Sequence, residues 1–430
     1  MGDHRREPNS KEEPVEVIVE RCAALDVHKD TIMAAVRLPG EKGTRRTELH
    51  EFRTWTSSLR ELRSWLVGHG VTQVAMEATG VYWKAPWHVL APEPSIEVML
   101  VNAQHVKNLP GRKTDVADAQ WLASLLECGL LRGSFVPDPV MSRLRDLTRY
   151  RKKLTEERGR ETQRIQKVLE DAGIKLDSVV SDVLGKGPRH MIEALIAGER
   201  DPDVLAEMAL TRTRARIPEL RLALEGGFSE HHAFMLATHL RHVDHLGAQI
   251  DAIDQRLEAE IAPFERQVER LCTVVGIGKV TAQAIVAEIG VDMGRFPTAA
   301  HLASWAGMCP GNHESAGKRR SGKARKGNAA LRSALIEAAW SASHSRNSYY
   351  AAQYQRFRRR FGKKSESKAI FVVAHAMLVT IWHLLAHETD YADLGADWFD
   401  RRSDNDAHAR RLAHQIERLG YKVTVEPVAA

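Results

Sequence analysis

The first 130 residues alternate between short apolar runs typical of strands and longer runs with the spacing of amphipathic helices. CAALDVHKDTIMAAVRL (22–38) predicts two strands, and TSSLRELRSWLVGHG (56–70) predicts a helix that ends at a glycine. Further strands are expected at 46–54, 71–80 and 96–102. This alternation predicts an α/β domain built on a mixed sheet.

Helical patterns dominate beyond residue 136. Residues 139–172 read as one long charged helix with loosely heptad-spaced apolar residues, and a second long helix is expected over 231–268. The pair predicts a coiled coil, either antiparallel within one chain or between chains. The irregular helical segment at 175–230 has no assigned role. The expected parts are a disordered tail (1–17), the α/β domain (18–135), a helical and coiled-coil region (136–268), a C-terminal helical domain (269–390) and a polar tail (391–430).

A chain of 430 residues is too long for one ordinary core, which agrees with several domains. Its four cysteines form no CxxC pair, so reduced thiols, a cytoplasmic location and no zinc are expected. The apolar run at 369–387 is almost long enough to cross a bilayer, but it carries three histidines. We interpret it as a buried core helix and expect no membrane segment.

The net charge of +6 is modest, but the basic residues are clustered. RYRKK (149–153), KRRSGKARK (318–326) and RFRRRFGKK (356–364) are the three densest runs. Any one of them fits a solvated helix face equally well, and the three together favour a nucleic-acid partner.

Two apolar helical segments flank Gly276-Ile277-Gly278 in LCTVVGIGKVTAQAIVAEIG (271–290). This is the helix-hairpin-helix pattern, in which a glycine turn lets backbone N–H groups approach a phosphate. Gly276, Gly278 and the following Lys279 are therefore candidate nucleic-acid contacts. A plain helical turn is the alternative.

Four acidic residues stand where strands end or helices begin. Asp115 and Asp118 share one face at the start of a helix, where capping by Thr114 and the helix dipole would explain them on their own. Asp26 and Glu77, however, each end an apolar strand, where an acid that only faces solvent has no special reason to be. In an α/β sheet such positions can converge at one edge.

Four converging carboxylates would repel one another and their pKa values would rise unless cations lay between them. Magnesium, which prefers carboxylate oxygen, is the natural occupant, and two ions about 4 Å apart can clamp a phosphoryl displacement. We therefore predict that Asp26, Glu77, Asp115 and Asp118 bind Mg²⁺ as two ions in one site. Four unrelated surface acids are the alternative.

The blocks ALDVHKD, MEATGVYW and RKTDVADA resemble those of the DEDD transposases, the insertion-sequence recombinases of the IS one-ten family, and of the related Piv-type DNA invertases. VVGIGKVTAQAIVAEIG and the following PGNHESAGKRRSGKARKGNAALR resemble the family's C-terminal transposase domain. The resemblance covers most of 20–130 and 265–345. It implies a RuvC-like (RNase H-type) catalytic domain followed by coiled-coil and transposase domains.

The resemblance also implies a serine nucleophile at Ser315. From the residues alone, a loop serine that caps a helix fits better, and only the resemblance separates Ser315 from Ser321. His313 and Glu314 have no assigned role, and His28 is either structural or a support for Asp26. The basic residues expected to hold nucleic acid around the serine are Lys318, Arg319, Arg320, Lys323, Arg325 and Lys326.

By the same resemblance, the protein would cut and rejoin donor and target DNA, guided by a noncoding RNA of its element. It would act near the bacterial nucleoid as a homodimer or dimer of dimers, with the long helices as the dimer contact. The alternatives are a RuvC-like nuclease that hydrolyses DNA, a site-specific DNA invertase, and a catalytically silent nucleic-acid-binding protein.

Overall fold

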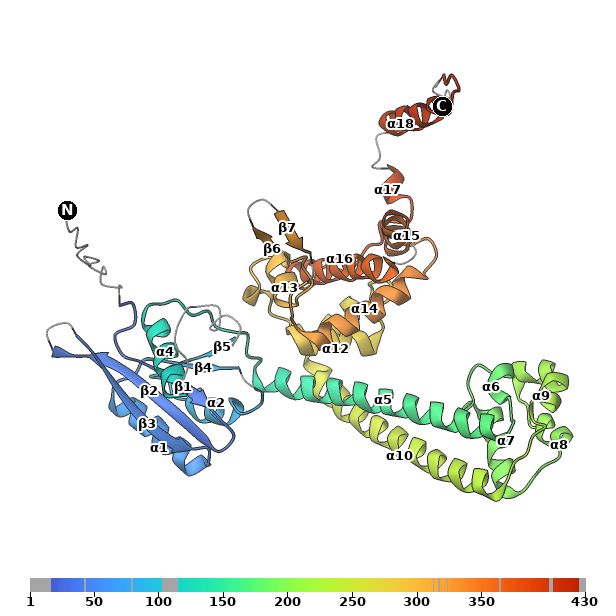
Figure 1. Cartoon of the computed structure of the whole chain (residues 1–430), viewed down its shortest axis with the longest axis horizontal. Helices are drawn as coiled ribbons and strands as arrows, with labels where there is room; N and C mark the ends of the chain where they lie inside the picture. Colours follow the sequence, from blue (N-terminus) through green and yellow to red (C-terminus); the bar gives the residue numbers. More distant parts are fainter. Residues whose placement is uncertain are drawn as a thin grey trace, which may run out of the picture. The chain divides into compact units, whose positions relative to one another are not determined.

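A computed structural model describes residues 17–41, 44–78, 80–102, 115–311, 313–315, 318–322, 324–362, 365–401 and 405–424 (Figure 1). The expected tail over 1–17 lies outside these residues except for Val17, and so do Thr114 and Lys323. The chain divides into two compact units, residues 1–136 and 137–430. The finer division of the second unit at residue 268 stays a prediction.

The first unit is built on a five-stranded sheet of order β3-β2-β1-β4-β5. Strands β1, β2 and β3 are antiparallel neighbours, whereas β4 runs parallel to β1 and β5 runs parallel to β4. The sheet is therefore mixed, as the alternating sequence pattern predicts. The strands are β1 (Cys22–Val27), β2 (Thr31–Pro39), β3 (Arg45–Arg53), β4 (Gln73–Glu77) and β5 (Glu97–Val101).

Helices cover both faces of this sheet (Figure 1). Helices α1 (Thr56–Gly68) and α2 (Lys84–Leu90) pack on one face, and α4 (Asp115–Glu127) packs on the other. The buried Glu127 at the end of α4 forms ion pairs with Arg37 of β2, at 2.7 Å, and with Arg45 of β3. These pairs fix the far end of α4 against the sheet, which sets the position of its first turn.

The second unit begins with a long helical hairpin. Helix α5 (Pro139–Asp171) packs against α10 (Glu230–Ile261) in the antiparallel sense within one chain. Arg143 pairs with Glu260 at 3.0 Å at one end of the hairpin, and His232 lies 3.1 Å from Asp171 at the other. The expected second helix over 231–268 is shorter than predicted, because Pro263 cannot donate a helical hydrogen bond and the chain turns there.

Between these two helices, residues 172–228 form a small helical subdomain that we call the distal head (Figure 1). Its core contains buried leucines, isoleucines and valines and is continuous with the ends of α5 and α10. The elements of the distal head are α6 (Leu176–Val179), α7 (Lys186–Ala197), α8 (Pro202–Glu207), the 3-10 helix η2 (Thr211–Arg216) and α9 (Ile217–Ala223).

The remaining helices surround the apolar helix α16 (Glu366–His387), which packs against α13, α14 and α15. α16 is long and apolar enough to cross a membrane, but half of its most apolar window is buried inside the protein, as in a core helix. The other elements are η3 (Ala262–Phe264), α11 (Glu265–Cys272), α12 (Lys279–Ile289), η4 (Met293–Arg295), α13 (Ala299–Trp305), α14 (Ala329–Ser343), α15 (Tyr349–Phe361), α17 (Trp398–Arg401) and α18 (Asn405–Glu417).

Candidate active site

Asp26 and Glu77 lie at equivalent positions on neighbouring parallel strands. In the register of β1 and β4, Leu25 is opposite Met76, and the two acids are the next residues along their strands. Glu77 is in turn opposite Val101 at the end of β5. The carboxyl ends of the three strands therefore meet at one edge of the sheet, which is where ligands bind in open α/β sheets.

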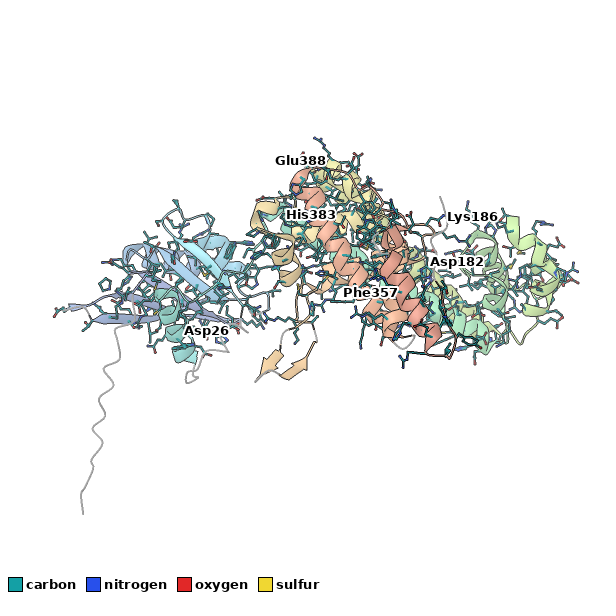
Figure 2. The ribbon with its side chains drawn as sticks, turned by 90° about the horizontal axis from the view of Figure 1, so that it is seen from above. Asp26, Asp182, Lys186, Phe357, His383 and Glu388 are labelled. Atoms are coloured by element: carbon teal, nitrogen blue, oxygen red, sulfur yellow. The ribbon has the colours of Figure 1, made fainter. Side chains whose placement is uncertain are left out.

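Both acids face the side of the sheet that α4 covers. Side chains alternate between the two faces along a strand, and Ala24 and Ala75 belong to the core shared with α4. Asp26 and Glu77, two residues further along, therefore face the same helix. Asp118 lies half-buried in the first turn of that helix. Figure 2 shows Asp26 at this edge of the first unit.

His28 is a direct contact of the site. Its Nε2 atom lies 3.1 Å from Oδ2 of Asp26, and the imidazole is 54% exposed while Asp26 is 23% exposed. An exposed imidazole that contacts a half-buried carboxylate can hold that carboxylate in one orientation, which favours the supporting role over a purely structural one.

The fourth acid and the metal site stay predictions. Asp115 begins α4, but its side chain lies outside the described part of the chain. Within the described part, no group of three or more His, Cys, Asp or Glu side chains could hold a metal ion. The register and the helix position bring Asp26, Glu77 and Asp118 to one face, and their carboxylate oxygens are the donors that magnesium prefers.

Ser315 lies in a β-hairpin of the second unit. β6 (His313–Ser315) pairs with β7 (Lys318–Ser321), and Ser315 is opposite Lys318. The loop expected around Ser315 therefore contains a short β-hairpin. A two-residue Ala-Gly connection between short polar runs is a hairpin signal, since glycine adopts the turn conformations that such hairpins need. The side chains of this hairpin lie outside the described residues.

The base of this serine hairpin is held by a close backbone crossing. Gly307 has φ +67°, and a Cβ atom there would lie 2.7 Å from the carbonyl oxygen of Arg325. A Cβ atom on Gly327 would overlap the backbone of Ala306. Arg332 of α14 donates from Nη2 to the carbonyl oxygens of Gly307, at 3.1 Å, and of Arg325, at 3.0 Å. The two glycines therefore let the chain cross itself where the hairpin leaves the helical core.

A buried carboxylate joins this base to α5. Glu288 is 1% exposed, accepts both guanidinium hydrogen bonds of Arg149 at 2.7 and 2.8 Å, and accepts one from the Asn328 amide at 2.6 Å. Asn328 also caps α14, because its side chain accepts from the N–H of Leu331. The bond to Glu288 raises the pKa of Arg149, whereas burial lowers that of neighbouring Arg145 to about 10. Sequence analysis missed this cluster, for which the glycines at 307 and 327 are the sole local signal.

The predicted helix-hairpin-helix turn has a packing role at its first glycine. Gly276 has φ +91°, and a Cβ atom there would lie 2.7 Å from the backbone nitrogen of Ala342 in α14. Gly278, by contrast, is exposed and has open space around the position of a Cβ atom. Lys279 forms an ion pair with Glu258 at 3.3 Å. A phosphate contact at this turn stays a prediction for Gly278 and Lys279, and Gly276 has a sufficient structural explanation.

The basic runs differ in how many of their cations are free. Arg149 binds Glu288, Arg151 binds Asp254 of α10, and Lys152 binds Glu337 of α14, so the run at 149–153 joins helices within the protein. The side chains of Lys318, Arg319, Arg320 and Lys323 lie outside the described residues. Arg325 and Lys326 are exposed and their side chains form no ion pair with another described residue, as expected of cations available to nucleic acid.

Comparisons with known proteins match both halves of the chain. A transposase profile of the DEDD type, named for IS110, matches residues 23–174, and a profile described as transposase IS116/IS110/IS902 family matches residues 268–355. The first match contains all four acids and the second contains Ser315.

Curated relatives match over shorter segments. A probable family 20 transposase of Pseudomonas aeruginosa is 30% identical over 148 residues, which cover 32% of this chain and 44% of that protein. Pilin gene-inverting proteins of Moraxella bovis and Moraxella lacunata are each 37% identical over 106 residues, 24% of this chain and 31% of theirs. The chain thus spans less than half the length of the curated relatives it matches. With two profiles of one family matched in order along it, the chain belongs to the IS116/IS110/IS902 family of DEDD-type transposases.

Proposed function

We propose that this protein is a DNA transposase or recombinase that cuts and rejoins DNA strands with a four-acid metal site and a serine nucleophile. The observation that carries the proposal is the placement of Asp26 and Glu77 at equivalent ends of parallel strands, on the face that the Asp118 helix covers. A structural protein has no need of carboxylates concentrated at one strand edge, because they repel one another.

Asp26, Glu77, Asp115 and Asp118 would hold two magnesium ions, and the DEDD transposase family is generally metal-dependent. Bound magnesium supplies positive charge that stabilises the attacking and leaving oxygens of a phosphoryl displacement. The residues of this chain present the carboxylates from two strands and one helix, and the ion pairs of Glu127 hold that helix in place.

Ser315 is the proposed nucleophile. Its hydroxyl loses a proton and Oγ attacks a DNA phosphorus atom, a P–Oγ bond forms, and the bond from phosphorus to the leaving strand's oxygen breaks. The leaving strand takes up the proton as a terminal hydroxyl. A strand hydroxyl of the partner DNA then attacks the same phosphorus and releases Ser315, so the phosphodiester count is conserved and no ATP is needed.

Choice of sequence is proposed to rest on a noncoding RNA encoded by the element, which pairs with donor and target DNA. The exposed Arg325 and Lys326 beside the serine hairpin would contact nucleic-acid backbone, so binding would weaken steeply with salt. The working form would be a homodimer or dimer of dimers, with the α5–α10 hairpin as the dimer contact.

Site-specific inversion is the second candidate, favoured by the two pilin gene-inverting relatives. Inversion and transposition share the strand chemistry and differ in the arrangement of the two DNA sites. The same protein can therefore be tested on both with plasmids that carry the sites in cis or in trans.

The experiment that tests the proposal is strand cleavage and rejoining in water enriched in oxygen-18. Wild type, Asp118→Asn and the control Asp30→Asn, an exposed acid outside the candidate site, are mixed with magnesium, transcribed element RNA and plasmid DNA. The proposal expects magnesium-dependent recombinants without oxygen-18 at the junctions, lost in Asp118→Asn alone. Oxygen-18 in the phosphates of cut DNA would instead identify a hydrolytic nuclease.

A further inference from the structure

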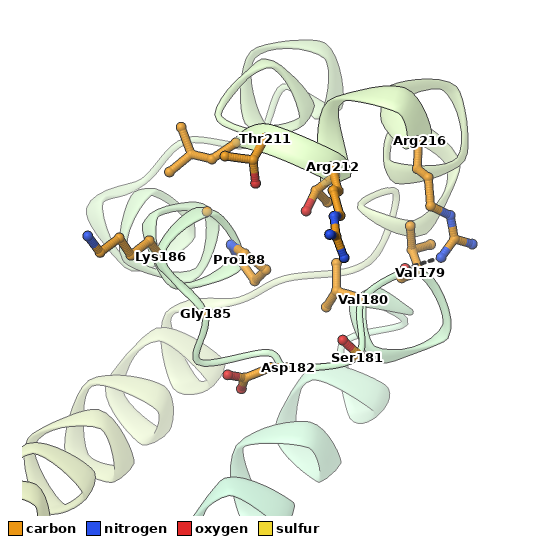
Figure 3. Close-up of a pocket in the computed structure, with 13 residues that line it drawn as sticks. Val179, Val180, Ser181, Asp182, Gly185, Lys186, Pro188, Thr211, Arg212 and Arg216 are labelled. Carbon is orange, nitrogen blue, oxygen red and sulfur yellow. Dashed lines mark hydrogen bonds between the residues drawn. The ribbon is translucent and has the colours of Figure 1, made fainter. Parts of the chain in front are cut away.

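The distal head contains a cavity of about 550 Å³ that no part of the proposed chemistry uses (Figure 3). The turn between α6 and α7 forms one wall, and the 3-10 helix η2 forms the other. All of the lining residues belong to the segment 175–230, for which sequence analysis assigned no role.

Arg212 lines this cavity without a partner among the described residues. Three arginines alternate along η2 in the sequence TRTRAR. Arg214 donates to the Ala209 carbonyl and to Glu207, and Arg216 binds the Val179 carbonyl and Glu219. For the Arg212 guanidinium, no hydrogen bond or ion pair to another described residue is found, and Figure 3 shows it directed across the cavity toward Val180.

Neutral hydrogen-bond donors line the same cavity as this guanidinium. Ser181, Thr211 and Thr213 line the cavity with hydroxyl groups that bond to no other side chain among the described residues. The 12-residue helix α7 begins at the cavity wall with Gly185 as its N-cap, so no side chain caps its first N–H groups. One positive charge with hydroxyl and amide donors around it is the arrangement that holds a single phosphate group.

The remaining charges limit what can enter. Asp182 lies at the opposite rim, where Oδ1 accepts the N–H of Leu184 at 2.9 Å, and its carboxylate disfavours a second phosphate there. Lys186 stands at the edge and extends away from the cavity (Figure 3). The cavity is therefore suited to one phosphodiester and not to a track of several.

We propose that the distal head binds one backbone phosphate of a nucleic-acid strand in this cavity, with Arg212 as the central contact. The identification of the strand as nucleic acid rests on the proposed function, because free phosphate presents the same chemistry. The head would thereby grip RNA or DNA at a point separate in sequence from the serine hairpin and from the four acids.

The first test measures binding by full-length protein to fluorescent RNA and DNA oligonucleotides, in EDTA so that no chemistry occurs. The variant Arg212→Gln is compared with Arg158→Gln, which removes the same charge from an exposed position on α5 with no side-chain partner among the described residues. Loss of one phosphate contact should weaken binding by about 5- to 10-fold near 0.1 M salt and reduce the salt slope by about 1. Arg158→Gln should change the affinity by less than about twofold.

Hydrogen exchange localises the contact. Saturating nucleic acid should protect residues 179–188 and 210–216 in the wild type and not in Arg212→Gln, and RNA and DNA are compared to identify the strand. Unchanged exchange in these segments, or equal behaviour of the two variants, would overturn the proposal. Protection of these segments by inorganic phosphate and not by oligonucleotide would also overturn it, in favour of a small-anion site. None of these outcomes depends on strand cleavage, so the proposed function is judged separately.

Discussion

Asp26 and Glu77 end two neighbouring parallel strands at the same register position and face the same covering helix, α4. Two carboxylates at adjacent strand ends gain nothing from each other, because like charges repel. A cation bound between them would remove this repulsion. This gives the candidate site a consequence for stability that can be measured without any DNA substrate.

Magnesium should raise the thermal stability of the wild type through these acids. A ligand that binds only the folded state at 100 times its Kd stabilises by about 2.7 kcal/mol. In Asp26→Asn and in Glu77→Gln the magnesium-induced rise in Tm, measured against each protein in EDTA, should fall to less than half. The control Asp30→Asn, an exposed acid in the turn after β1, should keep the full rise. An equal magnesium-induced rise in Tm in all four proteins would contradict a metal site at these acids.

The positions of Asp26 and Glu77 could be predicted because the sequence pattern that marks them is local. At Asp26 and again at Glu77, an apolar strand pattern stops at an acid, which predicts both the strand and the position of its end. The alternation of side chains along each strand then predicts which face of the sheet the acid lies on. The serine hairpin was not predicted because its strands are polar and only three and four residues long. Such short strands cannot show the alternation of apolar and polar residues that marks a strand. Its sole signal was the short Ala-Gly connection.

The Glu288 cluster should be a major source of stability in the second unit. Glu288→Gln neutralises a carboxylate that is 1% exposed and takes the charged partner from the half-exposed Arg149 guanidinium. Because Arg149 is 47% exposed, the loss should fall below the ~3–5 kcal/mol of a fully buried pair and above about 1 kcal/mol. The control Glu337→Gln breaks the pair with Lys152, in which the carboxylate is 62% exposed, and should cost less than about 1 kcal/mol. Denaturant unfolding with both variants checks this. Similar losses for the two would show that the Glu288 cluster does not hold the hairpin base.

Substitution of the two glycines of the predicted phosphate-binding turn should have different effects on stability. Gly276→Ala places a Cβ atom against α14 at φ +91° and should destabilise the fold by more than about 1 kcal/mol. Gly278→Ala meets open space and should leave the unfolding midpoint almost unchanged. If the turn contacts phosphate through Gly278, its alanine variant should nevertheless weaken DNA binding. Unchanged DNA binding in a stable Gly278→Ala protein would leave the turn a purely structural element.

Cys22 should make the first unit less stable at alkaline pH. Burial raises the pKa of this thiol from 9.0 to about 12, with a smaller contribution from nearby Glu127. Above about pH 9 the unfolded chain loses the proton while the folded protein keeps it, so the free energy of unfolding falls as pH rises, by up to about 1.4 kcal/mol per unit. Cys22→Ser has no such thiol and should lose less stability between about pH 8 and 10.5. Denaturant unfolding at several pH values measures the difference, and parallel slopes in the two proteins would contradict it.

Ion pairs between residues far apart in the sequence could not be predicted from sequence patterns. Arg149 and Glu288 are separated by 139 positions, and nothing local marks the two as partners. The run at 149–153 therefore read as a nucleic-acid surface, although Arg149, Arg151 and Lys152 bind acids of three other helices. A cluster of positive charge indicates a polyanionic partner only where the protein supplies no acids of its own. Arg212 was missed for the converse reason, because Arg214 and Arg216 have partners within the described part of the chain and Arg212 has none there.

We propose that strand transfer proceeds through a covalent bond between Ser315 and DNA. The most direct measurement is a denaturing gel of protein mixed with magnesium, transcribed element RNA and labelled cognate DNA. Ser315→Ala and Ser321→Ala, the other serine of the same hairpin, are run in parallel. A labelled protein–DNA band is expected in the wild type and in Ser321→Ala and should be absent in Ser315→Ala. Nicked DNA produced equally by all three proteins, with no such band, would contradict it and leave a metal-dependent nuclease.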